Sequence, residues 1–246
     1  MTRGGGPGLR PQPQPMPASI ADNLAAVRHR IAEAARRSGR PAESVTLVAV
    51  SKTHPAEAVR EALAAGQRVF GENRVQEAVA KIESVGAGAE WHLIGHLQTN
   101  KAKQVPGNFA VVHSVDSERL AQALHSHCPP GAQPLKVLLQ LNLHREATKS
   151  GMRDEEEARR LLEAIGKMPG LTPVGLMTIP DPGLPEGETR KHFAEVRGML
   201  GRLQQAVSPG PAFGELSMGM SHDFEWAIEE GATLVRVGTA IFGQRS

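Results

Sequence analysis

Lys52 stands at the end of a short apolar run, residues 45–51, that is too short and too rich in valine for a helix. Such a run predicts a strand buried on both faces. In parallel α/β proteins, ligands bind at the carboxyl ends of the strands, and a lysine held there against apolar walls can act as an amine nucleophile. The alternative is a lysine whose ammonium simply reaches solvent from the strand end.

The turn after the last predicted strand holds Gly238 and Thr239. Their backbone N–H groups and the threonine hydroxyl could donate to anionic oxygens, and barrel enzymes often bind phosphate at this place. Ser217 enters the same corner and could hold a phosphate oxygen, whereas we expect Ser221 to be the N-cap of the following helix. An ordinary turn at Gly238 is the alternative.

Arg236 lies inside a strand otherwise made of valine, leucine and glycine, where a permanent charge is costly without a partner. A structural salt bridge would account for it. The other interpretation is a guanidinium that donates to an unprotonated ring nitrogen. A lysine able to form an imine, a place for phosphate and a donor for a pyridine nitrogen together describe a site for pyridoxal 5′-phosphate (PLP).

Two histidines, His92 and His96, are four residues apart on a predicted strand and loop, without the helix or the glutamate of the metalloprotease motif. We therefore expect no metal site. The single cysteine, Cys128, cannot form an internal disulfide or a thiolate metal cluster, and it has no recognisable partners for a catalytic triad.

The elements that must position these residues alternate along the chain. Strand-like runs are expected at residues 45–51, 68–71, 91–95, 110–115, 137–143, 174–179, 215–218 and 234–238. Helices are expected at residues 20–37, 56–65, 74–82, near 101, and at 117–127, 155–168, 187–207 and 222–230. This order predicts an α/β protein with a single (β/α)8 barrel, or an open doubly wound sheet as the alternative. Little chain follows the eighth strand, so we expect the helix at 20–37 to complete the outer ring.

Composition sets the outer limits. A chain of 246 residues with 40% hydrophobic content suits one barrel domain, here residues 19–246, and the glycine- and proline-rich residues 1–18 predict a disordered tail. The net charge of +2 is spread along the chain, which argues against nucleic-acid or membrane partners. No apolar run could span a bilayer and no signal peptide is evident, so we expect a soluble, cytoplasmic protein.

Seven motifs in order give the chain a resemblance to the pyridoxal phosphate homeostasis proteins, from about residue 20 to the C-terminus. They are Val-Ser-Lys52-Thr, Phe-Gly-Glu72-Asn73, Trp91-His-Leu-Ile-Gly-His-Leu-Gln-Thr-Asn100-Lys, Gln140-Leu-Asn142 with Lys149-Ser-Gly, Gly175-Leu-Met177-Thr-Ile-Pro180, Leu-Ser217-Met-Gly-Met-Ser221 and Val-Arg236-Val-Gly-Thr239. The chain departs from this family at His96, where proline is usual, and at His222, where an acid is frequent.

This resemblance implies a barrel similar to the N-terminal domain of alanine racemase, with PLP carried as an aldimine on Lys52. It also implies that the other cofactor-binding residues lie around that lysine. They are Asn73 near the ring, Met177 lining the pocket, Arg236 on the ring nitrogen, and Ser217, Gly238 and Thr239 around the phosphate.

The expected role is PLP homeostasis: binding, buffering and delivering the cofactor, with an influence on amino-acid and keto-acid balance. Racemisation needs proton donors and acceptors on both faces of the substrate, and the racemases use a tyrosine of a second domain, whereas this chain has no tyrosine. We therefore expect a non-catalytic protein, at most a weak racemase. We also expect a monomer, with PLP-dependent apo-enzymes as candidate recipients of the cofactor. The alternatives are an amino-acid racemase or related enzyme, with His92 or another unassigned group as second base, and a Schiff-base aldolase.

Overall fold

The computed structural model describes residues 19–143, 150–210 and 212–244, so the predicted tail and Lys149 lie outside the described residues. Eight parallel strands pair in chain order and close into a barrel, because the last strand pairs with the first. This confirms the predicted barrel and rules out the open sheet. The strands are β1 Thr46–Val50, β2 Val69–Glu72, β3 Glu90–Leu93, β4 Val111–Val115, β5 Leu135–Leu141, β6 Leu171–Thr178, β7 Glu215–Ser217 and β8 Leu234–Val237.

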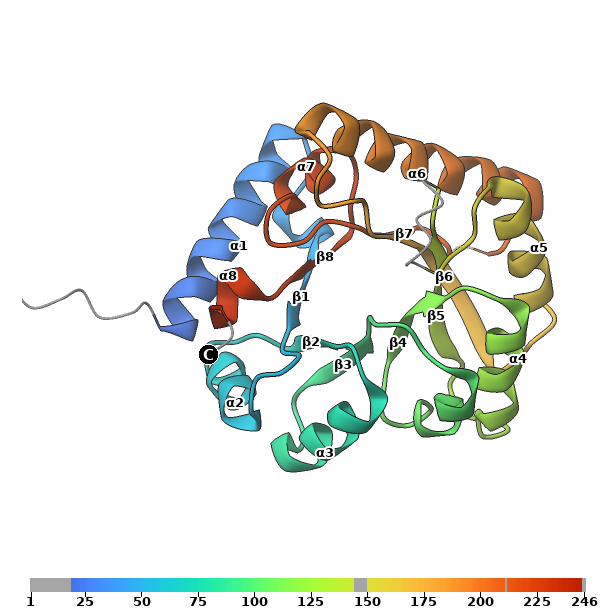
Figure 1. Ribbon diagram of the computed structural model, residues 1–246, viewed down its shortest axis with the longest axis horizontal. Coiled ribbons are helices and arrows are strands. Elements are labelled where there is room, and N and C mark those ends of the chain that lie inside the picture. The colour runs from blue at the N-terminus through green and yellow to red at the C-terminus, as the bar shows by residue number, and fades with distance from the viewer. Residues whose placement is uncertain (1–18, 144–149, 211, 245–246) are drawn as a thin grey trace, which may run out of the picture.

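Helices surround the barrel, as Figure 1 shows. They are α1 Ile20–Arg37, α2 Ala56–Ala64, α3 Val75–Val85, α4 Glu118–His127, α5 Glu155–Ile165, α6 Glu186–Val207, α7 Phe224–Glu229 and α8 Thr239–Phe242, with short 3-10 helices η1 Ala42–Ser44 and η2 Thr99–Gln104. None of the described helices is both long and apolar enough to cross a membrane.

The first helix closes the ring, as the sequence predicts. α1 begins with a capping box, in which the Ser19 hydroxyl accepts from the Asp22 backbone N–H and the Asp22 carboxylate accepts from the Ser19 N–H. Its apolar face buries Leu24, Val27 and Ile31. α1 packs between α2 and α7 and also against α8, so the first and last described helices lie side by side (Figure 1).

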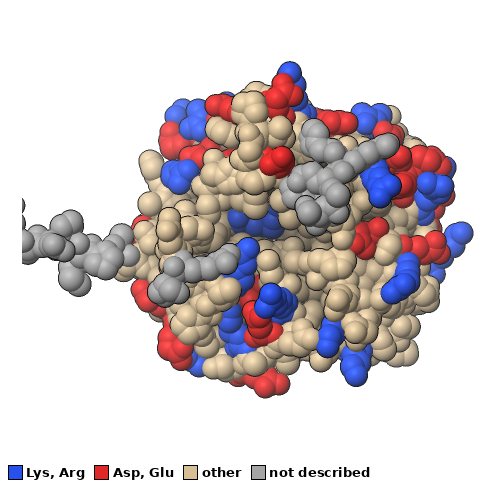
Figure 2. Space-filling model, viewed as in Figure 1, with Lys and Arg blue, Asp and Glu red and all other residues tan. Residues whose placement is uncertain are grey.

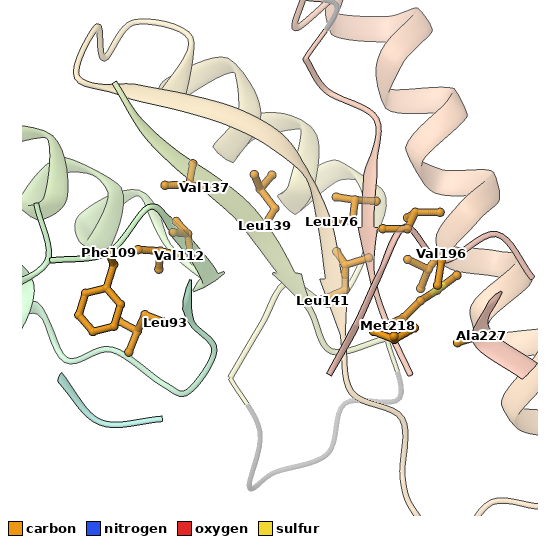
Figure 3. Close-up of a cluster of buried hydrophobic side chains, with 14 of the residues drawn as sticks. Leu93, Phe109, Val112, Val137, Leu139, Leu141, Leu176, Val196, Met218 and Ala227 are labelled. Carbon is orange, nitrogen blue, oxygen red and sulfur yellow. The ribbon is translucent and has the colours of Figure 1, made fainter. Parts of the chain in front are cut away.

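Two apolar layers hold the barrel together. The outer layer lies between strands and helices, and one buried cluster in it includes Val137 and Leu139 of β5, Leu176 of β6 and Val196 of α6 (Figure 3). A smaller inner cluster fills the barrel with Val48, Val50, Ile94, Val111, Leu138, Val174, Met177 and Leu234. Because successive strand residues face opposite sides, both layers come from the same strands. This double burial explains the nearly continuous apolar runs of the sequence.

The helix expected at 222–230 begins later, at Phe224. The Asp223 carboxylate accepts from the Met220 N–H at 2.6 Å, which holds residues 220–223 in a turn instead. Ser221 is therefore not the N-cap of α7, because that position belongs to Asp223. The Ser221 side chain lies in the lining of the cavity described below and does not cap a helix.

Candidate functional site

A cavity of about 870 Å³ opens at the carboxyl ends of the strands. Five of the predicted cofactor-binding residues line it, namely Lys52, Asn73, Arg236, Gly238 and Thr239. They come from the ends of β1, β2 and β8 and from the loops that follow. Figure 2 shows the central hollow of this face with basic side chains inside it. The barrel thus brings together residues that are up to 187 positions apart in the sequence.

Lys52 is the second residue after β1, separated from the strand by Ser51, and is half-buried. The next residue, Thr53, has a φ of 67°, in the left-handed region that residues with a side chain rarely adopt. Such a conformation costs on the order of 1 kcal/mol and persists only where the surrounding structure imposes it. The turn therefore fixes the direction in which the chain leaves the strand, and with it the position of the lysine.

A buried ion pair anchors the residue before this lysine. The Ser51 hydroxyl donates to Glu72 Oε1 at 2.7 Å, and Lys81 Nζ donates to the same oxygen at 2.5 Å and to the Ser51 carbonyl at 2.8 Å. Glu72 has no exposed side-chain surface, and only 10% of the Lys81 side chain is exposed. Glu72 is therefore a structural residue behind the cavity and does not project into its mouth. Lys81 is neutralised in place and does not compete with Lys52.

Arg236 forms part of the cavity floor. Its guanidinium donates from Nη1 to the Ser217 hydroxyl at 2.5 Å and from Nη2 to the Thr178 carbonyl at 2.9 Å. Among the described residues no carboxylate forms an ion pair with it, so the salt-bridge interpretation is not what the structure shows. Burial lowers the pKa of Arg236 to about 10, and the charge of Asp223 partly opposes this shift. Arg236 thus stays protonated at neutral pH.

Ser217 and Met177 lie below the cavity and not in its lining. Both are fully buried: the Ser217 hydroxyl contacts Arg236 and His113 inside the barrel, and Met177 belongs to the inner apolar cluster. Neither side chain lines the cavity of this structure, because both point into the barrel below its mouth. The phosphate contact of Ser217 and the lining position of Met177 stay predictions.

Ser221, Gly238 and Thr239 form the corner of the cavity next to β8. The Ser221 hydroxyl accepts from the Gly238 N–H at 3.3 Å. A side chain at position 238 would lie 3.1 Å from the Val50 carbonyl oxygen, so glycine lets β1 and β8 approach each other here. This corner offers hydroxyl and backbone N–H groups of the kind that bind phosphate.

The charge of the lining is one-sided. Its ionisable side chains are Lys52, Arg236, His54, His96 and His222, and none of the described residues that line the cavity is an aspartate or a glutamate. The two cations, Lys52 and Arg236, favour an anionic ligand in this cavity. The cavity can therefore take a molecule that carries phosphate.

The last described residues cover one side of the cavity. The His54 ring stacks on Phe242, with 5.2 Å between ring centroids, and Gly243 and Gln244 line the cavity beside them. The Asn23 side chain donates to the Ile241 carbonyl at 2.9 Å and ties α8 to α1. The loop that carries Lys52 is thus held against the C-terminal segment.

The two histidines of the 92–96 segment lie in different places. His92 is inside the barrel, bonded to His113 and Glu90, and does not line the cavity. His96 is exposed at the mouth, with Nδ1 at 3.1 Å from the Ser150 hydroxyl. They cannot bind one metal ion together, and His92 is not placed as the second base of a racemase.

Three residues of the site region were missed by the sequence interpretation: Lys81, His113 and Asp223. Lys81 lies on a helix and looks like a solvated charge. His113 offers a usable pattern, because a histidine within Val111–Val115 is a polar residue inside a buried strand. Asp223 is a residue type that is common at helix N-caps, and residue type alone does not reveal that it also holds the turn before α7 through the Met220 N–H.

Comparison with known proteins agrees with this geometry. The alanine racemase N-terminal domain family matches residues 23–246. A pyridoxal phosphate homeostasis protein of Pseudomonas aeruginosa is 47% identical over 228 residues, covering 92% of this chain and 96% of the relative. The namesake from Escherichia coli is 46% identical over 230 residues, covering 92% of this chain and 97% of the relative.

Solved structures show the same likeness. PipY of Synechococcus elongatus is 42% identical, and 92% of this chain matches 100% of PipY. The TM-score is 0.83 for PipY without PLP and 0.80 for PipY with PLP bound. The predicted barrel similar to the racemase N-terminal domain is thereby confirmed.

Proposed function

Because the chain belongs to the pyridoxal phosphate homeostasis proteins, we propose that it binds PLP in the cavity at the carboxyl ends of its strands and holds the cofactor for delivery. The observation that carries the proposal is the juxtaposition of Lys52 and Arg236 in one cavity. A PLP-bound relative with 42% identity supports it.

The residues present fit this group. When bound, PLP supplies an aldehyde that bonds to a primary amine and a pyridine ring that withdraws electrons. Lys52 is the amine in the lining, Arg236 supplies donors for the ring nitrogen, and Asn73 lines the same cavity. Ser221, Gly238 and Thr239 would hold the phosphate.

We further propose that the chain is not an efficient catalyst. A guanidinium that stays charged at neutral pH can donate to the ring nitrogen but has no proton to give up there, so the ring remains a weaker electron sink. Racemisation also needs a second base opposite the lysine. The sequence has no tyrosine, and His92 lies outside the cavity. The geometry thus favours retention of the cofactor over turnover.

Retention would be useful if the cofactor is later passed on. PLP-dependent apo-enzymes are the recipients we propose, and amino-acid and keto-acid balance would follow from their loading. We also propose that residues 19–246 form the single PLP-binding domain and that the protein is a cytoplasmic monomer.

Absorption spectroscopy tests the binding proposal. Protein incubated with PLP and freed of excess should show the band of a lysine–cofactor bond, which borohydride reduction removes while leaving the added mass on the peptide that contains Lys52. Lys52→Ala should lack both, whereas Lys103→Ala, which removes an exposed lysine, should retain them. Wild-type protein without the band would contradict the proposal.

Chiral chromatography tests the second part. Cofactor-loaded protein incubated with L-alanine should leave the amino acid unracemised at rates well below those of ordinary enzymes, for which turnover of about 10 per second is typical. Fast formation of D-alanine would contradict the carrier role. Transfer can be followed by the activity that an apo-aminotransferase regains when mixed with the loaded protein.

A further inference from the structure

Below the cavity, a chain of hydrogen bonds runs through the inside of the barrel, where apolar side chains normally pack. Arg236 Nη1 lies 2.5 Å from Ser217 Oγ, and Ser217 Oγ lies 2.8 Å from His113 Nδ1. His113 Nε2 lies 2.9 Å from His92 Nδ1, and His92 Nε2 lies 2.9 Å from Glu90 Oε1. The chain thus links four strands, β8, β7, β4 and β3, across the barrel.

The middle of this chain is sealed from solvent. His113 and Ser217 have no exposed surface, and His92 and Arg236 are 2% and 4% exposed. The far end is open, because half of the Glu90 side chain, 52%, is exposed where β3 begins. The chain therefore connects the solvent at the amino-terminal ends of the strands to the cavity floor at the carboxyl ends.

The donors along the chain all point the same way. The Ser217 hydroxyl accepts from Arg236, so its own hydrogen goes to its other described partner, His113 Nδ1. An unprotonated Nδ1 leaves the proton of a neutral His113 on Nε2, which donates to His92 Nδ1. His92 then carries its proton on Nε2 and donates to the Glu90 carboxylate. Every described polar atom on the way has a partner.

The charges support this direction. Burial holds the pKa of His113 well below its ordinary value, and the charge of Arg236 lowers it further, so the imidazole is neutral at pH 7. The bond from His92 lowers the pKa of Glu90, which keeps that end anionic. Arg236 forms no ion pair with a carboxylate among the described residues. Its charge is thus coupled to the Glu90 charge through the hydrogen bonds of Ser217, His113 and His92.

We propose that Glu90, His92, His113 and Ser217 are positioning residues that hold the Arg236 guanidinium toward the cavity and orient its donors for the ring nitrogen of PLP. The orienting role toward PLP rests on the proposed function, whereas the chain itself is a property of the protein without cofactor. Direct pairing with a carboxylate would hold the guanidinium too, but would use the donors and the charge that a ligand needs.

Nitrogen-15 NMR of the histidine rings in cofactor-free protein tests the chain. At pH 7, His92 and His113 should both be neutral, with the proton on Nε2 and an unprotonated Nδ1. Assignment follows from the spectra of His92→Phe and His113→Phe. A proton on Nδ1 of either ring, or a charged ring, would overturn the proposal, because the donors would then not run from Arg236 to Glu90.

Cofactor affinity tests the positioning role. His113→Phe keeps the ring but removes both nitrogens, and should weaken PLP binding about tenfold, the size of one lost hydrogen bond. His113→Gln retains one donor and one acceptor, and should recover most of that loss. If the phenylalanine and glutamine variants bind equally, or both bind as the wild type does, the positioning role is wrong.

Glu90→Ala keeps the proposal testable if the His113 variants do not fold. This change lies at the solvent end of the chain, so it should weaken PLP binding about threefold and shift the His92 ring signals. Glu43→Ala removes an exposed carboxylate just before β1 at the same end of the barrel, and should change neither. If Glu90→Ala and Glu43→Ala change PLP affinity and the His92 ring signals equally, Glu90 has no role in the hydrogen-bond chain.

The two proposals fail in different ways. Absence of PLP binding in the wild type would remove the proposed function and the orienting role, but the ring tautomers would still be measured in the cofactor-free protein. PLP binding by the wild type with unaltered affinity in His113→Phe and Glu90→Ala would leave the proposed function and remove this inference.

Discussion

Two buried cations lie on either side of β1, and the protein stabilises them in different ways. Lys81, next to β2, forms an ion pair with Glu72 in which the carboxylate is fully buried. Arg236, on β8, bonds to a hydroxyl and a carbonyl, while Ser217, His113 and His92 separate it from the Glu90 carboxylate at the other end of the barrel. The charge of Lys81 is balanced by its ion pair with Glu72, whereas the charge of Arg236 is directed into the cavity. The comparison separates a cation that holds the fold from one that faces a ligand.

The largest effect is expected from Lys81→Ala. Removing the ammonium leaves the Glu72 carboxylate buried without its ion pair, which should lower the free energy of unfolding by about 3–5 kcal/mol. Urea denaturation monitored by tryptophan fluorescence measures the loss. The double variant Glu72→Gln/Lys81→Met removes both charges and should lose much less. Equal losses in the single and double variants would contradict the buried-pair account.

Arg236→Met should show the opposite balance. The change removes a buried cation that has no described carboxylate partner, so unfolding stability should change by less than about 1 kcal/mol. PLP binding should fall about 10- to 100-fold, because charged donors to the ring nitrogen are lost. Titration of cofactor-free protein with PLP and urea denaturation measure the two effects. A large loss of stability with unchanged affinity would reverse the comparison.

The pH dependence of stability should report on His113. Its folded-state pKa lies well below the ordinary value, so below about pH 6.5 the unfolded chain takes up a proton that the folded protein refuses. Stability from this residue is therefore fully present above pH 6.5 and falls as the pH drops toward the folded-state pKa, by about 1.4 kcal/mol per pH unit.

Urea denaturation at several pH values between about 7 and 5 measures this dependence, because the lowered pKa of His113 makes stability change in that range. His113→Phe should show a shallower loss over the same range, whatever its stability at pH 7. A variant with the same slope as the wild type would mean that other groups cause the dependence.

Ser51→Ala should have the smallest effect. It removes one hydrogen bond to Glu72 while Lys81 remains in place, so the loss in unfolding free energy should be about 1 kcal/mol. Thermal unfolding measures it. A loss as large as that of Lys81→Ala would mean that the hydroxyl, and not the ammonium, stabilises the buried carboxylate.

The sequence alone was sufficient for the order of strands and helices because that signal is local, whereas closure of the sheet into a barrel is shown by the pairing of β1 with β8. Each strand is an apolar run buried on two faces, and each helix has a periodic face, so order and type follow from neighbouring residues. Lys52, Asn73, Arg236, Gly238 and Thr239 could be placed at one mouth for the same reason, since the ends of parallel strands share one side.

The contacts below the mouth depend instead on register and on side-chain direction. Ser217 was assigned to the phosphate, although strand alternation turns it into the barrel toward His113. His113 and His92 meet across neighbouring strands, 21 positions apart, and no periodicity marks that pairing. Ser221 was assigned to a helix cap that the turn held by Asp223 displaces. These positions are set by tertiary packing, which single residue types do not reveal.

The stack of His54 on Phe242 has a consequence for the order of events during synthesis. The cavity takes its lining from residue 50 to residue 244, with Lys52 made early and the wall of Gly238, Thr239 and Gly243 made late. A nascent chain that still lacks α8 therefore has Lys52 in place but lacks part of the cavity lining. The cavity is complete only after β8 and α8 have left the ribosome, so ligand binding requires the whole barrel.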